Sequence, residues 1–430
     1  MSIKLRLILM SFLQFFVWGA WLITIGAYWF QTKHWSGAQF GAIFSTMGIA
    51  SLFMPSIAGF IADRWVNAEK LYGLFHILGA AVLFSVPLVD DPTMMFWVML
   101  LNMLFYMPTI ALSIAVAYAA LKRDGKDVVI DYPPIRVWGT IGFIVALWTV
   151  SLLHMETSGG QFYIASAASL LLGLYAFTLP KCPPLFDRAR RSVAGVFGLT
   201  SFALFKNAQM AIFLVFAMFL GAALQLTNAY GDTFLHDFAN VDSYKNLAAV
   251  RYPAIIMSIS QISETVFILT IPFFLRNFGI KKVMLISMLA WVLRFGLFAY
   301  GDPGAGLWMI VLSCIVYGMA FDFFNISGSL FVETQSDPSI RASAQGLFML
   351  MTNGVGAILG SSISGIVIDR YFTAADGTRD WHGIWITFAI YALVVAVLFM
   401  VLFKHKHDPQ AMDALQPAAA LESEGGISAP

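Results

Sequence analysis

The chain has 430 residues, of which 59% are hydrophobic and only 11% are charged, and its formal net charge is +1. Soluble domains carry about 25% charged residues, so this composition, with a mean hydropathy of +0.78, excludes an ordinary soluble protein and places the chain in a lipid bilayer. The near-zero net charge argues against nucleic acid as a partner. Cys182 and Cys314 have no metal-ligand or disulfide spacing, so we expect no disulfide, metal or cofactor.

Twelve apolar runs of roughly 20 residues follow one another, each long enough to cross about 30 Å of hydrocarbon as a helix. The first follows a basic start but continues for about 25 residues, longer than the apolar core of a cleavable signal, so we expect it to remain as a spanning helix. The runs lie at 5–30, 40–62, 71–90, 93–121, 134–154 and 161–180, and then at 209–236, 251–275, 281–300, 306–332, 341–370 and 383–403.

This succession predicts an all-α membrane protein with twelve transmembrane helices in two six-helix bundles. The N-terminal bundle takes residues 1–180, and the C-terminal bundle takes residues 209–403. A polar, basic central loop at 181–208 joins them. The tail at 404–430 is low in complexity, and we expect it to be disordered.

The distribution of lysine and arginine over the loops predicts the orientation. With both termini on one side, that side and its edge hold about 19 of the 25 Lys and Arg residues, including the central-loop group. The opposite side keeps Lys33, Lys245, Arg251, Arg370 and Arg379, and Arg294 alone lies inside a span. Positive residues concentrate in cytoplasmic loops, so we expect both termini and the central loop to be cytoplasmic.

The two halves resemble each other weakly. IRVWGTIGF opens the fifth span at Ile135, and IRASAQGLF opens the eleventh at Ile340, the same ordinal position in its half. Six-helix repeats of this kind are typical of major facilitator transporters. GFIADRW, residues 59–65, closes the second span and resembles the loop motif of that superfamily.

Ionisable and amide side chains inside the spans are candidate functional residues, because polar groups at membrane depth cost several kcal/mol. The ionisable ones are Glu264 in the eighth span, Arg294 in the ninth, Asp322 in the tenth and Arg136 near the start of the fifth. The amides are Gln14, Asn102, Gln225, Asn228, Gln261, Asn325 and Asn353.

Helical spacing groups these residues into faces. The groups are Gln261 with Glu264, Gln225 with Asn228, Tyr317 with Phe321 and Asn325 (Asp322 lying beside Phe321), Arg136 with Thr140 and Phe143, and Gln14 with Trp18 and Trp21. A helix facing lipid would not carry such stripes, so we expect these faces to point into a shared cavity. Spans one, four, seven and ten, backed by five and eight, would line it.

Each residue also has a structural interpretation. A single buried amide in a membrane helix often serves as interhelical glue, worth about 0.6–2 kcal/mol. Glu264 could form a structural ion pair with Arg294, or Arg294 could snorkel to the outer interface. Asp322 could pair with Arg136 as a gate between the halves. The aromatic residues could be packing, which we favour for Trp21, and Pro108, Pro253 and Pro272 would bend or start helices.

The combination of convergent amides, aromatic faces and little fixed charge suits a neutral, planar, hydroxylated solute. A dicarboxylate or phosphate cavity would need several cationic residues, and a drug-efflux cavity would be more apolar. An enzyme is not expected, because no Ser/His/Asp or metal-ligand grouping lies at one depth and only His76 among the histidines lies well inside a span.

Long strings of the sequence resemble the nucleoside:proton symporter family of the major facilitator superfamily. They include SFLQFFVWGAW (11–21), PPIRVWGTIGFI (133–144), SISQISETVFILTIPFFL (258–275) and AFDFFNISGSLFVE (320–333), and the likeness extends over about residues 1–405. The resemblance implies proton-driven uptake of purine and pyrimidine nucleosides by a monomer in the bacterial inner membrane. It implies a pocket of Arg136, Thr140, Phe143, Gln225, Asn228, Gln261, Glu264, Tyr317 and Phe321, with Asp322 completing it. A preference for xanthosine, or a sugar or drug substrate on the same fold, remains open.

Glu264 is the residue we expect to carry the proton, because a low-dielectric surrounding favours the protonated form of a carboxyl group. Asp322 is the rival for this role, and the two acids could also share it as a coupled pair. Gln225, Asn228 and Gln261 would read the ribose hydroxyls and the base edge. Phe143, Tyr317 or Phe321 would stack on the base.

Overall fold

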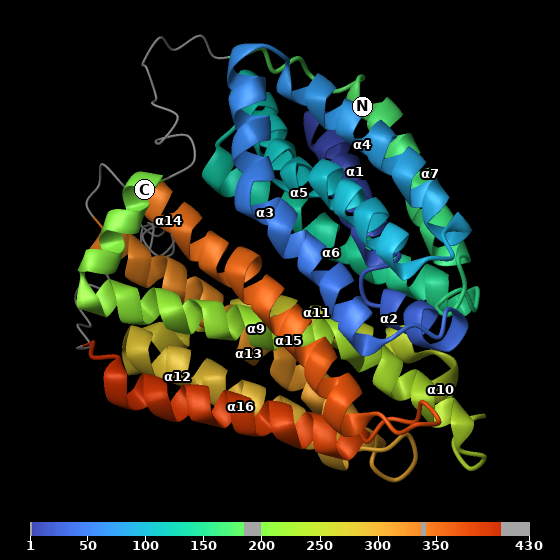
Figure 1. Cartoon of the computed structure of the whole chain (residues 1–430). Helices are drawn as coiled ribbons and strands as arrows, with labels where there is room; N and C mark the ends of the chain where they lie inside the picture. The colour runs from blue at the N-terminus through green and yellow to red at the C-terminus, as the bar shows by residue number, and fades with distance from the viewer. Residues whose placement is uncertain (1, 185–198, 337–340, 406–430) are drawn as a thin grey trace, which may run out of the picture.

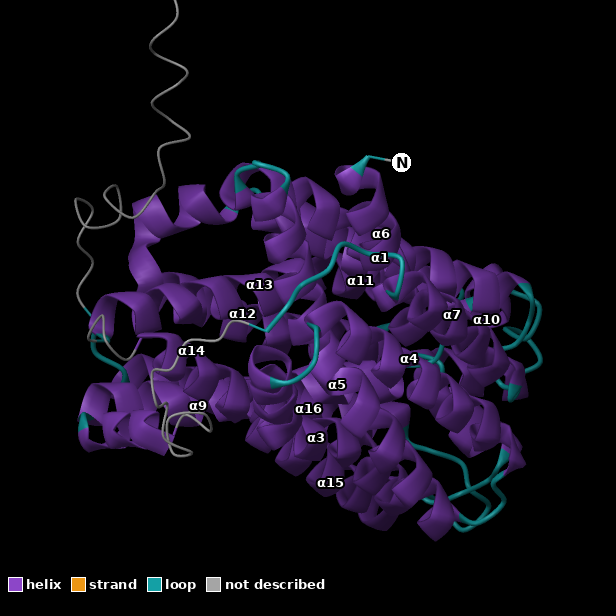
Figure 2. Ribbon diagram, turned by 90° about the horizontal axis from the view of Figure 1, so that it is seen from above, coloured by secondary structure: helices purple, strands orange, loops and turns teal. Residues whose placement is uncertain are grey.

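The computed structural model describes residues 2–184, 199–336 and 341–405, and these residues are helical almost throughout (Figure 1). Figure 2 shows helices joined by short loops, and within the described ranges the only β pairing is an isolated bridge between Thr373 and Arg379. The predicted all-α fold is confirmed for this part of the chain. The predicted disordered tail from residue 406 onward, and residues 185–198 of the central loop, lie outside it.

The described elements fall into two halves of the chain, before and after residues 185–198. The N-terminal half contains α1 (Ile3–Gly19), α2 (Ile25–Ala27), η1 (Tyr28–Thr32), α3 (Gly37–Arg64), α4 (Ala68–Ser85), η2 (Val86–Leu88), α5 (Pro92–Arg123), α6 (Val128–Leu152) and α7 (Gly160–Ala176). The C-terminal half contains η3 (Leu199–Lys206), α9 (Ala208–Asp237), η4 (Phe238–Asn240), α10 (Ala248–Arg251), α11 (Pro253–Ile268), α12 (Ile271–Tyr300), α13 (Leu307–Gln335), α14 (Arg341–Met349), η5 (Leu350–Gly356), α15 (Ala357–Val367), η6 (Ile368–Phe372) and α16 (Trp381–Leu402).

By length and composition, 9 helices of the described chain can each cross a membrane, and α7 and α11 are shorter apolar helices. The protein is therefore a multi-pass membrane protein. Two predicted spans are not continuous helices. The predicted span at 5–30 is not one helix, since α1 ends at Gly19. The predicted span at 251–275 is interrupted after Ile268, whereas the turn before the span at 281–300 lies at Gly279, inside the expected connection; its φ of 74° favours glycine.

Prolines and polar caps explain several helix starts. Pro253 and Pro272 lie in the first turns of α11 and α12, where a missing N–H breaks no hydrogen bond, as predicted. Pro108 lies inside α5. Ser36 forms a capping box with Gln39 at the start of α3. These local signals fix where the chain enters each helix.

The halves meet mainly where α3 crosses α15 and α6 crosses α11, and also where α2 lies against α9 and α3 against η5. The α3–α15 crossing is backbone against backbone, because a Cβ on Gly41 would clash with the carbonyl oxygen of Ser361. In Figure 1 the halves converge at the end near α2 and α10 and diverge towards the end where α1 begins and α16 ends. We call the convergent end, with its loops at 153–159, 241–247 and 373–380, the distal end.

Candidate functional site

A cavity of about 730 Å³ lies between the two halves. Nine of the ten residues predicted for the pocket line it: Arg136, Thr140, Phe143, Gln225, Asn228, Gln261, Glu264, Tyr317 and Phe321. They come from α6, α9, α11 and α13. Asp322 does not line it and is buried, 4% exposed, on the next position of α13.

The cavity is lined by more segments of the chain than the sequence predicted. The six expected spans all contribute, with Trp18 on α1 and Met107 on α5 completing the set. Three further segments also line it: α3, through Met47 and Ser51, η3, through Phe202, and the α14–η5 segment, which includes Asn353. The π-helical turns of η5 interrupt the regular helix beside the cavity, and such turns are frequent at functional sites.

Several polar atoms in the wall make no hydrogen bond to any described residue. Gln225 Oε1, Gln261 Oε1 and Trp18 Nε1 are each buried and without a partner. A buried donor or acceptor left unsatisfied costs about 1–3 kcal/mol. Two acceptors and one donor around one cavity are therefore available to hydrogen-bond a solute that offers both donors and acceptors.

The aromatic wall is preorganised. Tyr317 and Phe321 lie one helical turn apart on α13, and their rings are nearly parallel, with an interplanar angle of 5° and centroids 5.8 Å apart. Phe143 faces the same cavity from α6 in the other half. Flat faces from both halves can thus sandwich or flank a planar ring.

The charged side chains occupy distinct positions. The Arg136 guanidinium lies 4.0 Å from the centroid of the Phe15 ring, and Glu264, on α11 of the other half, is within electrostatic range of it. Asp322 is within range of Glu264 in turn, and its Oδ2 is buried without a hydrogen bond. The Arg136–Asp322 ion pair considered as a gate does not form in this conformation of the described structure.

The structure contradicts both interpretations of Arg294, the ion pair with Glu264 and snorkelling to the outer interface. Its side chain is fully buried, so it does not snorkel, and it forms no pair with Glu264. Its Nη1 instead donates to the Ser313 carbonyl oxygen at 2.6 Å and its Nε donates to Thr227 Oγ1 at 3.3 Å. The guanidinium also lies 4.7 Å from the centroid of the Tyr317 ring. Arg294 therefore joins α9, α12 and α13 and supports the aromatic wall from behind.

Gln14 and Trp21 do not reach the cavity, although they share a predicted face with Trp18. Gln14 is fully buried, donates to Thr109 Oγ1 at 2.9 Å and accepts from the Tyr72 hydroxyl at 2.7 Å. Its Oε1 also lies 2.9 Å from His76 Nε2. Trp21 packs against Phe162. Both residues therefore have structural roles: Gln14 hydrogen-bonds to neighbouring helices, and Trp21 packs against another aromatic ring.

The distal end is closed by contacts that the sequence analysis missed. Asp369, in η6 of the C-terminal half, accepts from the backbone N–H groups of Gly37 and Ala38 at 2.7 and 2.6 Å, in the first turn of α3. Reciprocally, Glu156 of the N-terminal half accepts from the backbone N–H of Ala254 at 3.2 Å, in the first turn of α11. Each half thus caps a helix of the other half with a carboxylate.

The cavity extends the other way, towards the termini. Its lining includes Phe202 in η3, which lies within the central loop, and Gly346 in α14. Pro55, near the end of α3 remote from the Asp369 contact, also lines it. The solute cavity and the distal closure therefore lie at different levels of the same interface between halves.

Comparison with known proteins identifies the chain's relatives. The family model described as Nucleoside H+ symporter matches residues 1–408. The xanthosine permease of Escherichia coli K12 is 58% identical over 411 residues, which cover 95% of this chain and 98% of that protein. The nucleoside permease NupG of the same organism is 52% identical over 408 residues, covering 95% and 97%.

Solved structures agree. A crystal structure of the nucleoside transporter NupG superposes with a TM-score of 0.89 at 52% identity, covering 94% of this chain and 100% of that one. A bacterial homologue of the human lysosomal transporter Spinster, in an inward-facing and unoccupied conformation, has a TM-score of 0.69 at 14% identity, which shows the fold alone. The match over nearly the whole length, in sequence and in structure, establishes that the chain belongs to the nucleoside H+ symporter family.

Proposed function

We propose that this protein imports nucleosides together with protons across the bacterial inner membrane by alternating access. The observation that carries the proposal is the cavity between the halves. It combines unpaired amide acceptors and an indole donor with two stacked rings and one carboxylate, Glu264. A nucleoside offers ribose hydroxyls, a base edge and a planar ring to match these groups. Membership in the nucleoside H+ symporter family supports the same substrates.

The proposed topology has twelve spans in two six-helix halves, residues 1–180 and 209–403, with the central loop 181–208 and both termini in the cytoplasm. Among the described residues, 9 helices are long and apolar enough to span a membrane, and α1, α7 and α11 would make up the remaining three of the proposed twelve. The excess of Lys and Arg on the side of the termini supports the orientation. In this orientation the distal end is periplasmic, and the conformation is inward-facing.

Within the cavity, we assign Gln225, Asn228 and Gln261 to the ribose hydroxyls and the base edge. Phe143 and the Tyr317–Phe321 pair would stack on the base. Arg136 and Thr140 lie beside Phe143 on α6 and would contact the solute from the N-terminal half. Because contacts come from both halves, solute binding would favour states in which the halves close around it.

Glu264 is the proposed proton carrier, with Asp322 as the second acid of a coupled pair. A carboxyl at the cavity wall can change protonation as the cavity opens to one side or the other. A proton-motive force of about 150 mV supplies about 3.5 kcal/mol per proton. At about 1.4 kcal/mol per tenfold change in concentration, one proton supports a few-hundredfold accumulation of nucleoside.

The test is uptake of labelled uridine into proteoliposomes with and without an inward proton gradient. Wild type should accumulate uridine only with the gradient, and unlabelled adenosine should compete. Glu264→Gln should lose accumulation, while Asp242→Asn, which alters an exposed loop carboxylate, should keep it. Uridine flux that ignores the gradient, or accumulation retained by Glu264→Gln, would remove the proton role from this residue. No nucleoside flux at all would overturn the substrate class.

Xanthosine belongs in the same assay as a competitor. The identity to the xanthosine permease, 58%, is higher than that to NupG, 52%. One or two changed contacts at the base edge, worth a few kcal/mol, are enough to switch the preferred base. Competition by xanthosine that exceeds competition by adenosine would favour a xanthosine-preferring permease within the same mechanism.

A further inference from the structure

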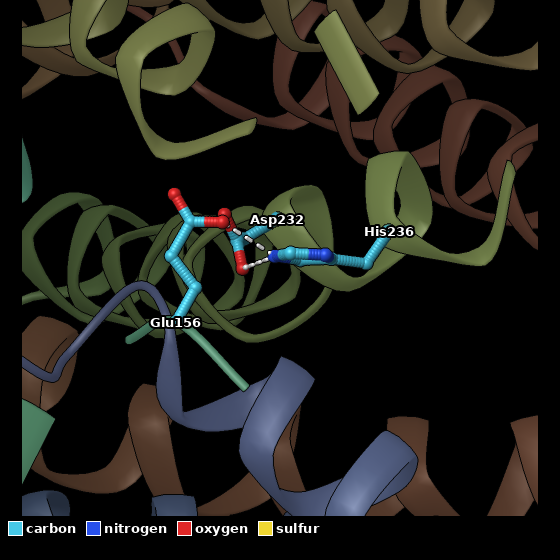
Figure 3. A group of neighbouring side chains, drawn as sticks. All are labelled: Glu156, Asp232 and His236. Carbon is cyan, nitrogen blue, oxygen red and sulfur yellow. Dashed lines mark ion pairs between the residues drawn. The ribbon is translucent and has the colours of Figure 1, made fainter. Parts of the chain in front are cut away.

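A group of two carboxylates and one imidazole lies at the distal end, apart from the solute cavity (Figure 3). Asp232 and His236 are four residues apart on α9, so their side chains project from one face of that helix. Glu156 comes from the other half of the molecule, in the loop between α6 and α7. All three side chains are buried, with 3% of Glu156, none of Asp232 and 9% of His236 exposed.

The three side chains present one ligand atom each to a common point. His236 Nε2 lies 2.7 Å from Glu156 Oε2 and 3.5 Å from Asp232 Oδ2, and all three atoms lie within 4.8 Å of one another. His236 Nε2 lies at ion-pair distance from both carboxylates (Figure 3), yet neither oxygen of Asp232 accepts a hydrogen bond from a described residue. Glu156 has one donor, the Ala254 N–H, but neither oxygen of Asp232 has one, and two carboxylates buried this close together favour a cation between them.

We infer that Glu156, Asp232 and His236 form a zinc site that bridges the two halves of the protein. One imidazole nitrogen and two carboxylate oxygens are a donor set that Zn²⁺ takes, with water or a further ligand in the fourth position. A divalent ion also neutralises the two carboxylates beside a neutral imidazole. Tetrahedral Zn²⁺ with bonds of about 2.0–2.2 Å places its ligand atoms about 3.3–3.6 Å apart. The 3.5 Å between Asp232 Oδ2 and His236 Nε2 already lies in this range. A small rotation of the Glu156 side chain would widen the 2.7 Å between its Oε2 and His236 Nε2 to match.

The position of the site gives it a consequence for conformation. Glu156 already bonds the α11 backbone through Oε1, which holds its Oε2 towards α9. If the halves separate at the distal end, Glu156 leaves Asp232 and His236, and the three-ligand set is lost. Zinc therefore binds the distally closed conformation more tightly than the open one and holds the distal end shut. The site also contradicts the expectation from the sequence that no metal-ligand grouping lies at one depth.

Zinc binding to the purified full chain tests the site without any transported substrate, so its failure would leave the proposed transport untouched. Competition with a chromophoric Zn²⁺ indicator should reveal one bound equivalent. His236→Gln and Glu156→Gln should each weaken binding at least tenfold, and His236→Cys, which restores a ligand, should retain it. The control is His382→Gln, since His382 lies outside the group, with Nδ1 against the Ala299 carbonyl oxygen.

Absence of bound zinc in wild type, or undiminished binding in both glutamine variants, would overturn the site. Asp232→Asn gives a third ligand variant if one of the others elutes as an aggregate. The clamp is tested by uptake: zinc added at the distal side should slow wild-type uptake at least tenfold and leave Glu156→Gln unaffected. Zinc that binds at one equivalent without slowing the wild type would overturn the clamp and leave the site standing.

Discussion

Asp369→Asn should open the distal end. In the closed conformation the Asp369 carboxylate accepts two backbone N–H groups at the start of α3, on the opposite half. Asparagine keeps one acceptor oxygen but loses the charge and the second acceptor. Helix N-terminal contacts of a charged side chain are worth about 0.3–2 kcal/mol. With two short bonds at a partly buried position, we expect a loss near the upper end, about 1–2 kcal/mol. The ratio of open to closed protein should then rise about 5- to 30-fold.

The assay is labelling of Thr233→Cys by a membrane-impermeant maleimide in vesicles. Thr233 is fully buried on α9 and contacts Gly26 of the other half, so a cysteine there is reached only when the distal end opens. The labelling rate is then proportional to the small open population. Background is low because both native cysteines are buried, and burial raises the pKa of the Cys182 thiol to about 11.

The matched control is Asp380→Asn. Asp380 caps α16 through the Gly383 N–H at 3.0 Å, which is the same chemistry inside one half. This variant should lose a comparable cap energy without changing the labelling rate. If Asp369→Asn labels at the parental rate, or if Asp380→Asn accelerates labelling equally, the Asp369 contact does not hold the halves together.

Three further outcomes follow from the packing. Gly41→Leu should prevent the α3–α15 crossing and reduce uptake at least tenfold while raising Thr233→Cys labelling; normal uptake would contradict the backbone contact. Arg294→Lys should lower the free energy of unfolding by about 1.5–3 kcal/mol, because hydrogen bonds from a charged donor are lost. A thermal melting curve equal to that of wild type would show that the bonds from Arg294 to Ser313 and Thr227 do not stabilise the fold. Phe321→Ala should weaken nucleoside binding by about 1–3 kcal/mol, roughly 5- to 150-fold by calorimetry; an unchanged affinity would exclude stacking on this ring.

The sequence predicted the cavity well where helical spacing carries the information. Gln225 with Asn228, Gln261 with Glu264, and Tyr317 with Phe321 lie three or four residues apart, and that spacing fixes a common face whatever the helices pack against. The structure turns all of these faces to one cavity. Pattern and structure agree because a membrane helix has few reasons to carry polar residues on one side.

The same rule failed where a polar residue finds its partner in another helix. Gln14 shares a face with Trp18, but its amide is used by Tyr72 and Thr109. Spacing shows which way a side chain points on its own helix and not what it meets there. The contribution of α3 was missed for the opposite reason, because its lining residues, such as Met47, are apolar or small and look like ordinary packing.

The distal contacts could not be predicted from local pattern. Asp369 and Glu156 bond to backbone groups of the other half, far away in sequence, and nothing in the α3 or α11 sequence indicates the partner. One signal was present: Asp232 and His236 lie four apart near the end of the seventh span, the spacing that places two ligands on one helical face. Their position at the edge of the span made them resemble ordinary loop residues.

The reciprocal caps also affect how this protein tolerates substitution. A carboxylate that bonds to main-chain N–H groups does not depend on the side chain that it faces, so Ala38 and Ala254 can vary while Asp369 and Glu156 cannot. Proline is the exception, since it removes the N–H and yet is welcome in the first turn of a helix. A proline at Ala38 would leave α3 intact and abolish half of one cap. In each of these contacts only the carboxylate residue is constrained in its identity, because its partner is a backbone group. A search for co-varying residue pairs would therefore not detect the contact between the halves.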